Sequence, residues 1–166
     1  MGDTQNLSGK KALEKIKELA EEKTTMFCTF EGDHMITRPM HTQGIDEDGT
    51  FWFFSDKDSH KNHIIQENSA VHLIYANNSS YEYLSIEGRA TIEHDQEKID
   101  ELWKDFAKAW FTEGKNDPSL SLIKVTPENG HYWDTKSNKV ISLMKIAVGA
   151  LTGKTMDNGL EGELRV

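Results

Sequence analysis

The sequence is poor in cysteine and in basic residues, and it has no long apolar run. Its only cysteine, Cys28, leaves no partner for an intrachain disulfide, so we expect a protein of a reducing compartment, the cytoplasm. The 19 lysines and arginines against 28 aspartates and glutamates give a net charge of -9. That balance argues against a general nucleic-acid-binding protein, which needs a basic face. No window approaches the roughly 20 apolar residues of a membrane span, and we predict neither membrane association nor a signal peptide.

Several motifs of well-known catalytic sites are missing as well. The sequence contains no Walker loop, no Rossmann glycine pattern and no nucleophile elbow. His60 and His63 are three residues apart, but no cysteine pair or His-Glu-x-x-His pattern accompanies them, so we predict no metal site. Cys28 alternates with Met26 and Phe30 in an apolar stretch, which indicates a buried small side chain rather than a nucleophile.

The apolar residues that are present follow regular patterns. The chain of 166 residues suffices for one domain with a real core, which we place at residues 1–153. Residues 154–166 are poor in apolar side chains, and we expect a flexible tail there. Apolar residues at helical spacing or in alternation predict helices at 8–22, 59–68 and 96–111, and strands at 24–30, 35–44, 50–55, 70–76, 81–95, 121–134 and 140–151.

The connections between the predicted strands are mostly short. Short connections favour antiparallel pairing, because parallel strands need a long crossover. Six or seven antiparallel strands with few helices are typical of a closed or nearly closed barrel. The sequence therefore predicts a mainly β (α+β) protein, an antiparallel barrel of six to seven strands with peripheral helices.

The stretch "FFSDKDSHKNH" at residues 53–63 turns abruptly from an apolar strand into a polar loop. Asp58 or Ser59 is a suitable N-cap for the helix that follows, and the first turn then holds His60, Lys61 and His63. Cations in a first turn oppose the helix dipole, at a cost of about 0.3–1 kcal/mol each when exposed. A phosphate bound at the helix start would reverse that cost. An ordinary capped helix with solvated charges remains the alternative.

The stretch "TRPM" places an arginine in the middle of a predicted strand. Pro39 removes a backbone donor, so this strand should lie at a sheet edge. Arg38 is then either a solvated edge residue or a ligand for the same anion as Lys61, since arginine can hold a phosphate with two hydrogen bonds.

The role of Trp133 also has two interpretations: it either covers a flat ring or packs in the core or an interface. We expect Trp103, Phe106 and Trp110 in the core.

These stretches together resemble the pyridoxamine 5'-phosphate oxidase-like superfamily of FMN-binding split β-barrels, in its general stress protein branch. The similarity runs from about residue 13 to residue 153, and its most specific part is 38–88. It implies a split barrel and a homodimer with FMN at the interface. It implies cofactor contacts at Arg38 and at Ser59, His60 and Lys61 for the phosphate, at Phe54 and Ser55 for the ribityl-phosphate path, at the Pro39–Met40 backbone for the ring, and at Trp133 from the partner subunit.

The chain departs from the true oxidases of that superfamily at several places. Those enzymes carry a second basic residue where His60 stands, a lysine where Gln43 stands and a glutamine at the position of Tyr83. Their C-terminal Arg-x-His motif is absent from the final "EGELRV". We therefore do not expect pyridoxamine 5'-phosphate oxidation.

The resemblance implies an FMN-dependent oxidoreductase that acts on an unknown small molecule, with a nicotinamide as a conceivable electron donor. No side chain needs to act as acid or base, although His41 is a candidate to contact the substrate. Two alternatives stay open: a non-catalytic stress protein that stores or senses flavin, and a relative that binds deazaflavin or haem.

Overall fold

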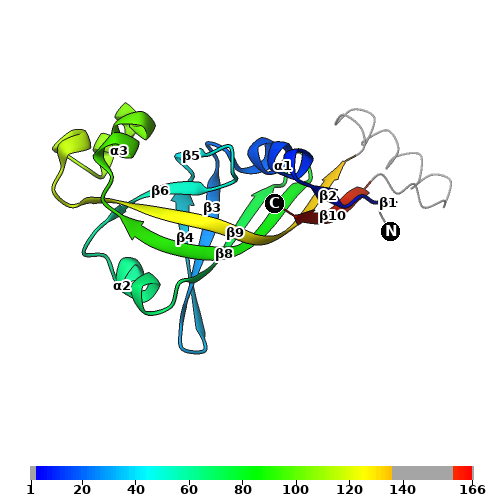
Figure 1. The fold of residues 1–166 in the computed structure, drawn as a ribbon, viewed down its shortest axis with the longest axis horizontal. Coiled ribbons are helices and arrows are strands. Elements are labelled where there is room, and N and C mark those ends of the chain that lie inside the picture. The colour runs from blue at the N-terminus through cyan, green and yellow to red at the C-terminus, as the bar shows by residue number, and fades with distance from the viewer. Residues whose placement is uncertain (1–2, 136–158, 166) are drawn as a thin grey trace.

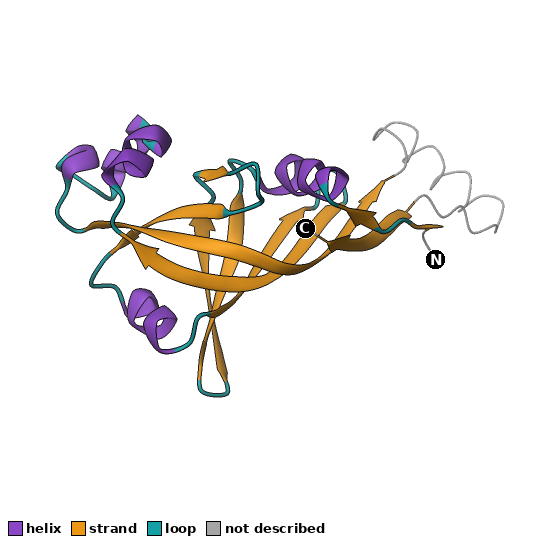
Figure 2. Cartoon of the chain, viewed as in Figure 1, coloured by secondary structure: helices purple, strands orange, loops and turns teal. Residues whose placement is uncertain are grey.

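Strands dominate the structure, a computed structural model in which residues 3–135 and 159–165 are described (Figures 1 and 2). The helices are α1 (Lys10–Ala20), α2 (His60–Glu67) and α3 (Gln96–Leu102), followed by short 3-10 turns at Asp105–Ala109 and Gly114–Asn116. The strands are β1 (Asp3–Thr4), β2 (Leu7–Ser8), β3 (Thr24–Glu31), β4 (His34–His41), β5 (Gly44–Ile45), β6 (Phe51–Asp56), β7 (Ala70–Asn77), β8 (Glu82–Glu93), β9 (Leu120–Thr135) and β10 (Gly159–Arg165).

The described strands form one curved sheet in the order β1-β10-β9-β8-β7-β3-β4. β6 pairs with the first part of β9 on the edge opposite β8, the same edge that β10 uses farther along β9. β6 also pairs with β5, and β2 pairs with β10. Every pairing is antiparallel except those of β1 and β2 with β10. The mainly β, antiparallel prediction is confirmed, but the sheet does not close into a full barrel: β4 and β6 approach each other without a hydrogen-bonded ladder in the described part of the chain.

Buried and exposed side chains alternate along the strands, and the buried ones form the core inside the curved sheet. Phe27 on β3 and Phe53 on β6 are fully buried, and their rings meet edge to face with centroids 5.2 Å apart. Cys28 is also fully buried, as predicted. In the β3–β4 ladder Arg38 lies opposite Phe27, so Arg38 starts from the core-facing side of an edge strand, while its neighbour Pro39 lies opposite the exposed Met26.

The predicted helix 96–111 is wrong beyond its first half. The helix ends at Leu102 because Trp103 adopts an extended backbone and packs on Phe54, with ring centroids 5.7 Å apart. The chain then forms the 3-10 turn Asp105–Ala109. Consequently Phe106 and Trp110 are 45% and 72% exposed, whereas the periodicity had placed them in the core.

The prediction of a flexible tail at 154–166 is also corrected by the structure. Residues 159–165 form β10, which pairs with β9, and Leu164 is only 1% exposed within the core. Leu160 and Leu164 alternate with charged residues, which is strand patterning, and Gly162 gives β10 room to pass close to the carbonyl oxygen of Gln5. Residues 154–158 and 166, like the strand expected at 140–151, lie outside the described residues.

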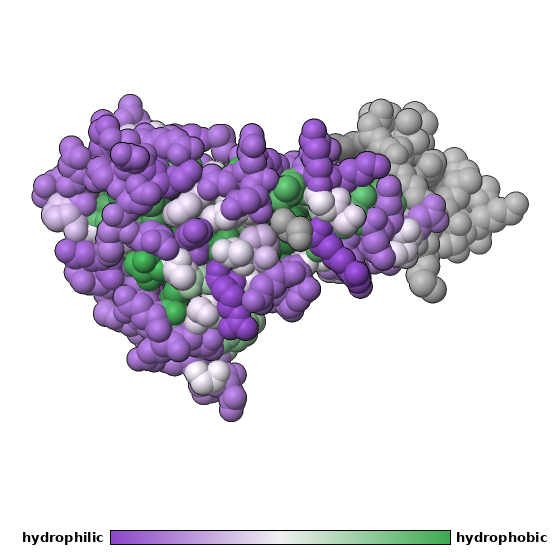
Figure 3. Space-filling model, viewed as in Figure 1, coloured by the Kyte–Doolittle hydropathy of each residue, from purple (hydrophilic) through white to green (hydrophobic). Residues whose placement is uncertain are grey.

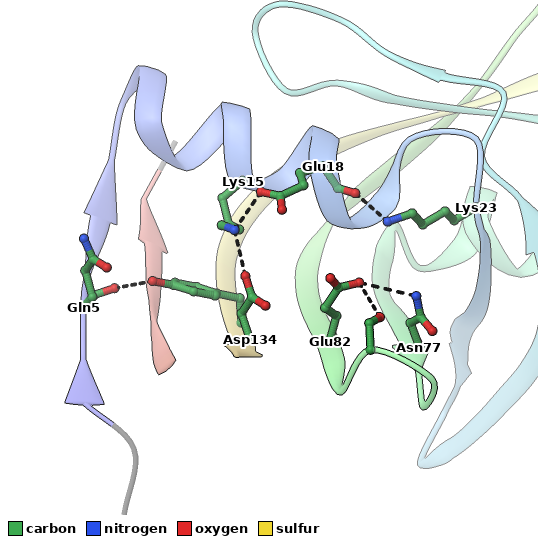
Figure 4. Close-up of polar contacts among 9 residues, drawn as sticks. Gln5, Lys15, Glu18, Lys23, Asn77, Glu82 and Asp134 are labelled. Carbon is green, nitrogen blue, oxygen red and sulfur yellow. Dashed lines mark hydrogen bonds and ion pairs between the residues drawn. The ribbon is translucent and has the colours of Figure 1, made fainter. Parts of the chain in front are cut away.

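Contacts from α1 and the N-terminus secure the far end of β9 (Figure 4). Lys15 on α1 pairs with Asp134 on β9 at 2.9 Å, and with Glu18 at 2.7 Å. The hydroxyl of Tyr132 donates to the carbonyl oxygen of Gln5 at 2.8 Å.

The three helices lie on two sides of the long strands. In Figure 1, α1 and α3 lie above the long strands β8 and β9 and α2 lies below them. None of the described helices combines the length and the apolarity required to cross a membrane.

Candidate functional site

A cavity of about 400 Å³ lies where β4 and β6 fail to pair. One end is cationic, with Arg38 from β4 and Lys61 from the first turn of α2. The other end is aromatic and is walled by Phe54, Phe106 and Trp110, among others. The face shown in Figure 3 is mostly hydrophilic, and hydrophobic residues appear on it only as small separate spots.

The start of α2 directs Lys61 into the cavity. Ser59 takes an extended backbone and its hydroxyl accepts a hydrogen bond from the Asn62 amide at 3.4 Å, so of the two predicted N-caps, Asp58 and Ser59, the structure shows Ser59. The Lys61 side chain then turns inward, is only 7% exposed, and donates to the hydroxyl oxygens of Ser55 and Ser59, the latter at 3.0 Å. The helix start thus presents a lysine and two hydroxyls together.

A buried polar network holds these hydroxyls in place. Ser55 donates to the side-chain oxygen of Asn62 at 2.7 Å, and the Asn62 side-chain nitrogen donates to Ser121 at 3.0 Å. Ser121 in turn donates to the backbone carbonyl oxygen of Ser55 at 2.9 Å. Because every member has a partner, the end of β6, the start of α2 and the start of β9 form one rigid unit beside Lys61.

Two cations, Arg38 and Lys61, face a single acidic side chain among the residues that line the cavity, the exposed Asp56. Burial and, after it, the positive charge of Arg38 together lower the pKa of Lys61 to about 8, against the opposite influence of Asp56. The Nε atom of Arg38 is buried and has no hydrogen-bond partner among the described residues. An anion bound beside Arg38 and Lys61 would accept a hydrogen bond from the unpaired guanidinium nitrogen. It would also stabilise the charged form of the buried lysine.

The aromatic end is formed partly by the turn that the sequence analysis misplaced. Phe106 meets His41 edge to face with centroids 5.1 Å apart, and meets Trp110 at 6.4 Å. Burial lowers the pKa of His41, and the nearby Lys104 lowers it further against the weaker pull of Glu22. The imidazole of His41 is therefore neutral at neutral pH, and this end of the cavity offers flat, uncharged walls.

The structure brings most of the predicted site residues together. Arg38, Pro39, Met40, Phe54, Ser55 and Lys61 all line the cavity, and Ser59 contacts Lys61 at its edge.

Two predicted site residues lie elsewhere in the chain. His60 points away from the cavity toward Glu31, with 3.3 Å between its Nε2 atom and the carboxylate. Trp133 lies on β9 opposite Tyr83 and packs on His131, with ring centroids 4.4 Å apart. It lines a different, open hollow with Ile74 and Tyr83. Within one chain, neither residue reaches the cationic end.

Four functional candidates escaped the sequence analysis or were misjudged by it. Phe106 and Trp110 had been assigned to the core on their helical spacing, and Gln43 had been noted only as a departure from the oxidases. Asn62 carried no signal beyond its place in the first turn of α2.

Among the described residues no three histidine, cysteine or acidic side chains come together in a group that could hold a metal ion.

Comparison with known sequences settles the family. The family described as "Pyridoxamine 5'-phosphate oxidase like" matches residues 11–157, which is most of the chain. The chain belongs to this family. Among curated relatives, General stress protein 26 of Bacillus subtilis is 27% identical over 97 residues, which cover 57% of this chain and 69% of that protein. Protein bli-3 of Neurospora crassa is 24% identical over 110 residues (61% of this chain), and the chain spans only 53% of its length.

Solved structures show the same fold. A general stress protein 26 from Jannaschia sp. CCS1 superposes with a TM-score of 0.73 at 25% identity, over 94% of this chain and 99% of that one. The general stress FMN/FAD binding protein of Xanthomonas citri gives a TM-score of 0.64 at 24% identity, over 78% of this chain and 89% of that one. The predicted membership of the general stress branch is thereby confirmed, and the open barrel is the split barrel that the resemblance implied.

Proposed function

We propose that this protein binds FMN, with the phosphate between Arg38 and Lys61 and the flavin ring at the aromatic end of the cavity. The observation that carries the proposal is the unpaired, buried Nε of Arg38 beside a lysine whose pKa burial has lowered. A phosphate monoester dianion fits this pair because it accepts several hydrogen bonds and neutralises both charges. The general stress relatives support a flavin, and the Xanthomonas citri structure is of a protein described as FMN/FAD binding.

Each part of the cavity has a role in this proposal. Arg38 and Lys61 hold the phosphate, and the hydroxyl of Ser59 can donate to it at its edge, while Ser55, whose own proton goes to Asn62, keeps Lys61 in place. Phe54 lines the path of the ribityl chain. The Pro39–Met40 backbone runs beside the ring, which Phe106 and Trp110 shield from water. His60, on the far side of the helix start, stays a prediction with no contact in the cavity to support it.

The reaction that we propose is a flavin-dependent oxidation or reduction of a small molecule, related to stress. FMN, once bound, supplies hydride and electron transfer. The protein binds and orients the cofactor, excludes water and presents the neutral His41 beside the open part of the cavity. Since Gln43 occupies the position of the oxidases' lysine, we do not propose pyridoxamine 5'-phosphate as the substrate. We place the protein in the cytoplasm and propose no nucleic-acid or membrane partner.

A homodimer is the natural assembly for this site. Met26, Ile74 and Trp133 are 43%, 39% and 40% exposed on the outer face of the sheet, where Met26 and Ile74 are cross-strand partners. A second copy that covered this face would remove these side chains from water. We propose that it would also bring its own Trp133 close to the flavin of the first copy.

The direct test is the absorption spectrum of the purified protein, together with the mass of the ligand released on denaturation. We expect a flavin spectrum and the mass of FMN. A haem or deazaflavin spectrum would replace this proposal by the corresponding alternative. Rapid reduction of the bound flavin by NADH or NADPH, followed by substrate-dependent reoxidation, would support an oxidoreductase; a flavin that neither nucleotide reduces would support the non-catalytic storage or sensing protein.

A further inference from the structure

The side chain of Gln43 carries a buried carbonyl oxygen that no group satisfies. Gln43 is 7% exposed and lines the cavity between β4 and β6. Its Oε1 atom and the Nε of Arg38 are the two buried side-chain atoms of the described chain that have no hydrogen-bond partner. A buried acceptor left unpaired costs about 1–3 kcal/mol, so its presence in a cavity indicates a partner that arrives with the ligand.

The backbone around Gln43 is fixed on both sides. The Gln43 amide donates to the carbonyl oxygen of Trp52 at 2.8 Å, and the Thr42 amide donates to that of Lys23 at 2.9 Å. The Thr42 hydroxyl is also hydrogen-bonded to the buried hydroxyl of Tyr75 at 2.7 Å. The side chain of Gln43 therefore leaves a rigid segment, and its direction is set before any ligand binds.

The two ends of the Gln43 amide have different surroundings. Its nitrogen donates to the backbone carbonyl oxygen of His41 at 3.4 Å, which only the nitrogen can do, because two carbonyl oxygens would repel each other. This contact occupies the nitrogen and leaves the oxygen as the unpaired end of a side chain that lines the cavity. Since the oxygen only accepts hydrogen bonds, it selects a neutral ligand group with an N–H or O–H and disfavours a second anion at this end.

Gln43 lines the same cavity as Arg38 and Lys61, which leaves room for a molecule with a phosphate at one end and a ring at the other. Gln43 follows Arg38 by five positions, and an extended chain of that length spans at most about 17 Å. The ring of oxidised flavin carries a single N–H, at N3, on the edge remote from the ribityl chain. We propose that Gln43 is a specificity-determining residue whose Oε1 accepts a hydrogen bond from this N3–H. The inference rests on the proposed flavin site and adds how the ring is recognised.

The test compares FMN with 3-methyl-FMN, in which a methyl group replaces the N3 hydrogen. Wild-type protein should bind 3-methyl-FMN at least about tenfold more weakly than FMN, because the analogue leaves the acceptor unpaired. Gln43→Met should bind FMN about five- to tenfold more weakly than wild type and should distinguish the two flavins by less than about twofold. Gln66→Met, which changes an exposed glutamine of α2, should behave as wild type.

Three results would separate the possible failures. If wild type binds neither flavin, the proposed function itself is wrong. If wild type binds both flavins equally, or if Gln43→Met keeps the full wild-type discrimination, then FMN binding stands and the role of Gln43 is refuted.

The thermal unfolding of the ligand-free proteins gives an independent readout. Gln43→Met should unfold at the wild-type temperature or above it, since methionine removes an unpaired buried oxygen; a clearly lower temperature would show that the oxygen is already paired inside the protein and would overturn the inference.

Discussion

Raising the pH above 8 should weaken the binding of FMN through a single side chain, Lys61. In the ligand-free protein the pKa of Lys61 is about 8 instead of 10.5. A phosphate beside the ammonium group stabilises the charged form and returns the pKa toward its ordinary value. FMN therefore binds best to the protonated lysine. The affinity should be independent of this group below pH 8 and should fall as the ligand-free lysine loses its proton.

The size of the fall in FMN affinity follows from the pKa shift of Lys61. A pKa difference of about 2.5 units corresponds to roughly 3 kcal/mol, because each unit is 1.36 kcal/mol. The dissociation constant should rise about tenfold between pH 7 and pH 9, and by up to about 300-fold by the pH at which the bound lysine also titrates. Below about pH 6 a separate loss is expected, because the phosphate monoester takes up its second proton there.

Titration of the apoprotein with FMN at each pH, followed by flavin fluorescence, measures this dependence. Lys61→Arg is the matched variant, because the guanidinium group stays charged over the whole range. Its affinity should be flat between pH 7 and pH 9, below the pH at which the N3–H of the flavin itself ionises. A flat profile for wild type, or the same fall for Lys61→Arg as for wild type, would refute the assignment of Lys61 to the phosphate.

Three further predictions concern stability and assembly. The ligand-free protein should become more stable to denaturant as the pH rises from about 8 to 10.5, because the unfolded state then binds the additional proton, and Lys61→Met should abolish that rise. Leu164→Ala should lower the free energy of unfolding by about 2–5 kcal/mol, whereas the exposed Arg165→Ala should change it little; equal effects would mean that β10 does not belong to the core. Ile74→Asp should shift the protein from dimer to monomer in analytical ultracentrifugation, and an unchanged dimer would place the interface elsewhere.

The parts of the site that the sequence predicted depend on local chemistry. A proline within a strand indicates an edge strand, because proline lacks the backbone N–H group that a hydrogen-bonded ladder needs, and Pro39 is such a residue. Ser59 marks a helix start for an equally local reason, and Lys61 then follows in the first turn. These signals placed the cationic end correctly without knowledge of the fold.

The parts that the sequence did not predict depend on contacts across the fold. The apolar spacing of 96–111 fits a long helix, but Trp103 leaves the helix to pack on Phe54, a contact that periodicity does not contain. β10 is short and contains two glycines, so its alternation of leucines with charged residues is a weak signal, and its pairing with β9 establishes the strand. Gln43 has no local signature, because the missing partner of its oxygen becomes visible only when the surroundings are known.

The central claim is that Arg38 and Lys61 bind the phosphate of a flavin. Its most direct measurement is the affinity of the apoprotein for FMN and for riboflavin, which differ only in that phosphate, in wild type and in Arg38→Met and Lys61→Met. We predict that wild type prefers FMN by a hundredfold or more, on the scale of about two charge-assisted hydrogen bonds, and that each variant loses most of this preference while its affinity for riboflavin changes little. Equal affinity of wild type for FMN and riboflavin would contradict the account.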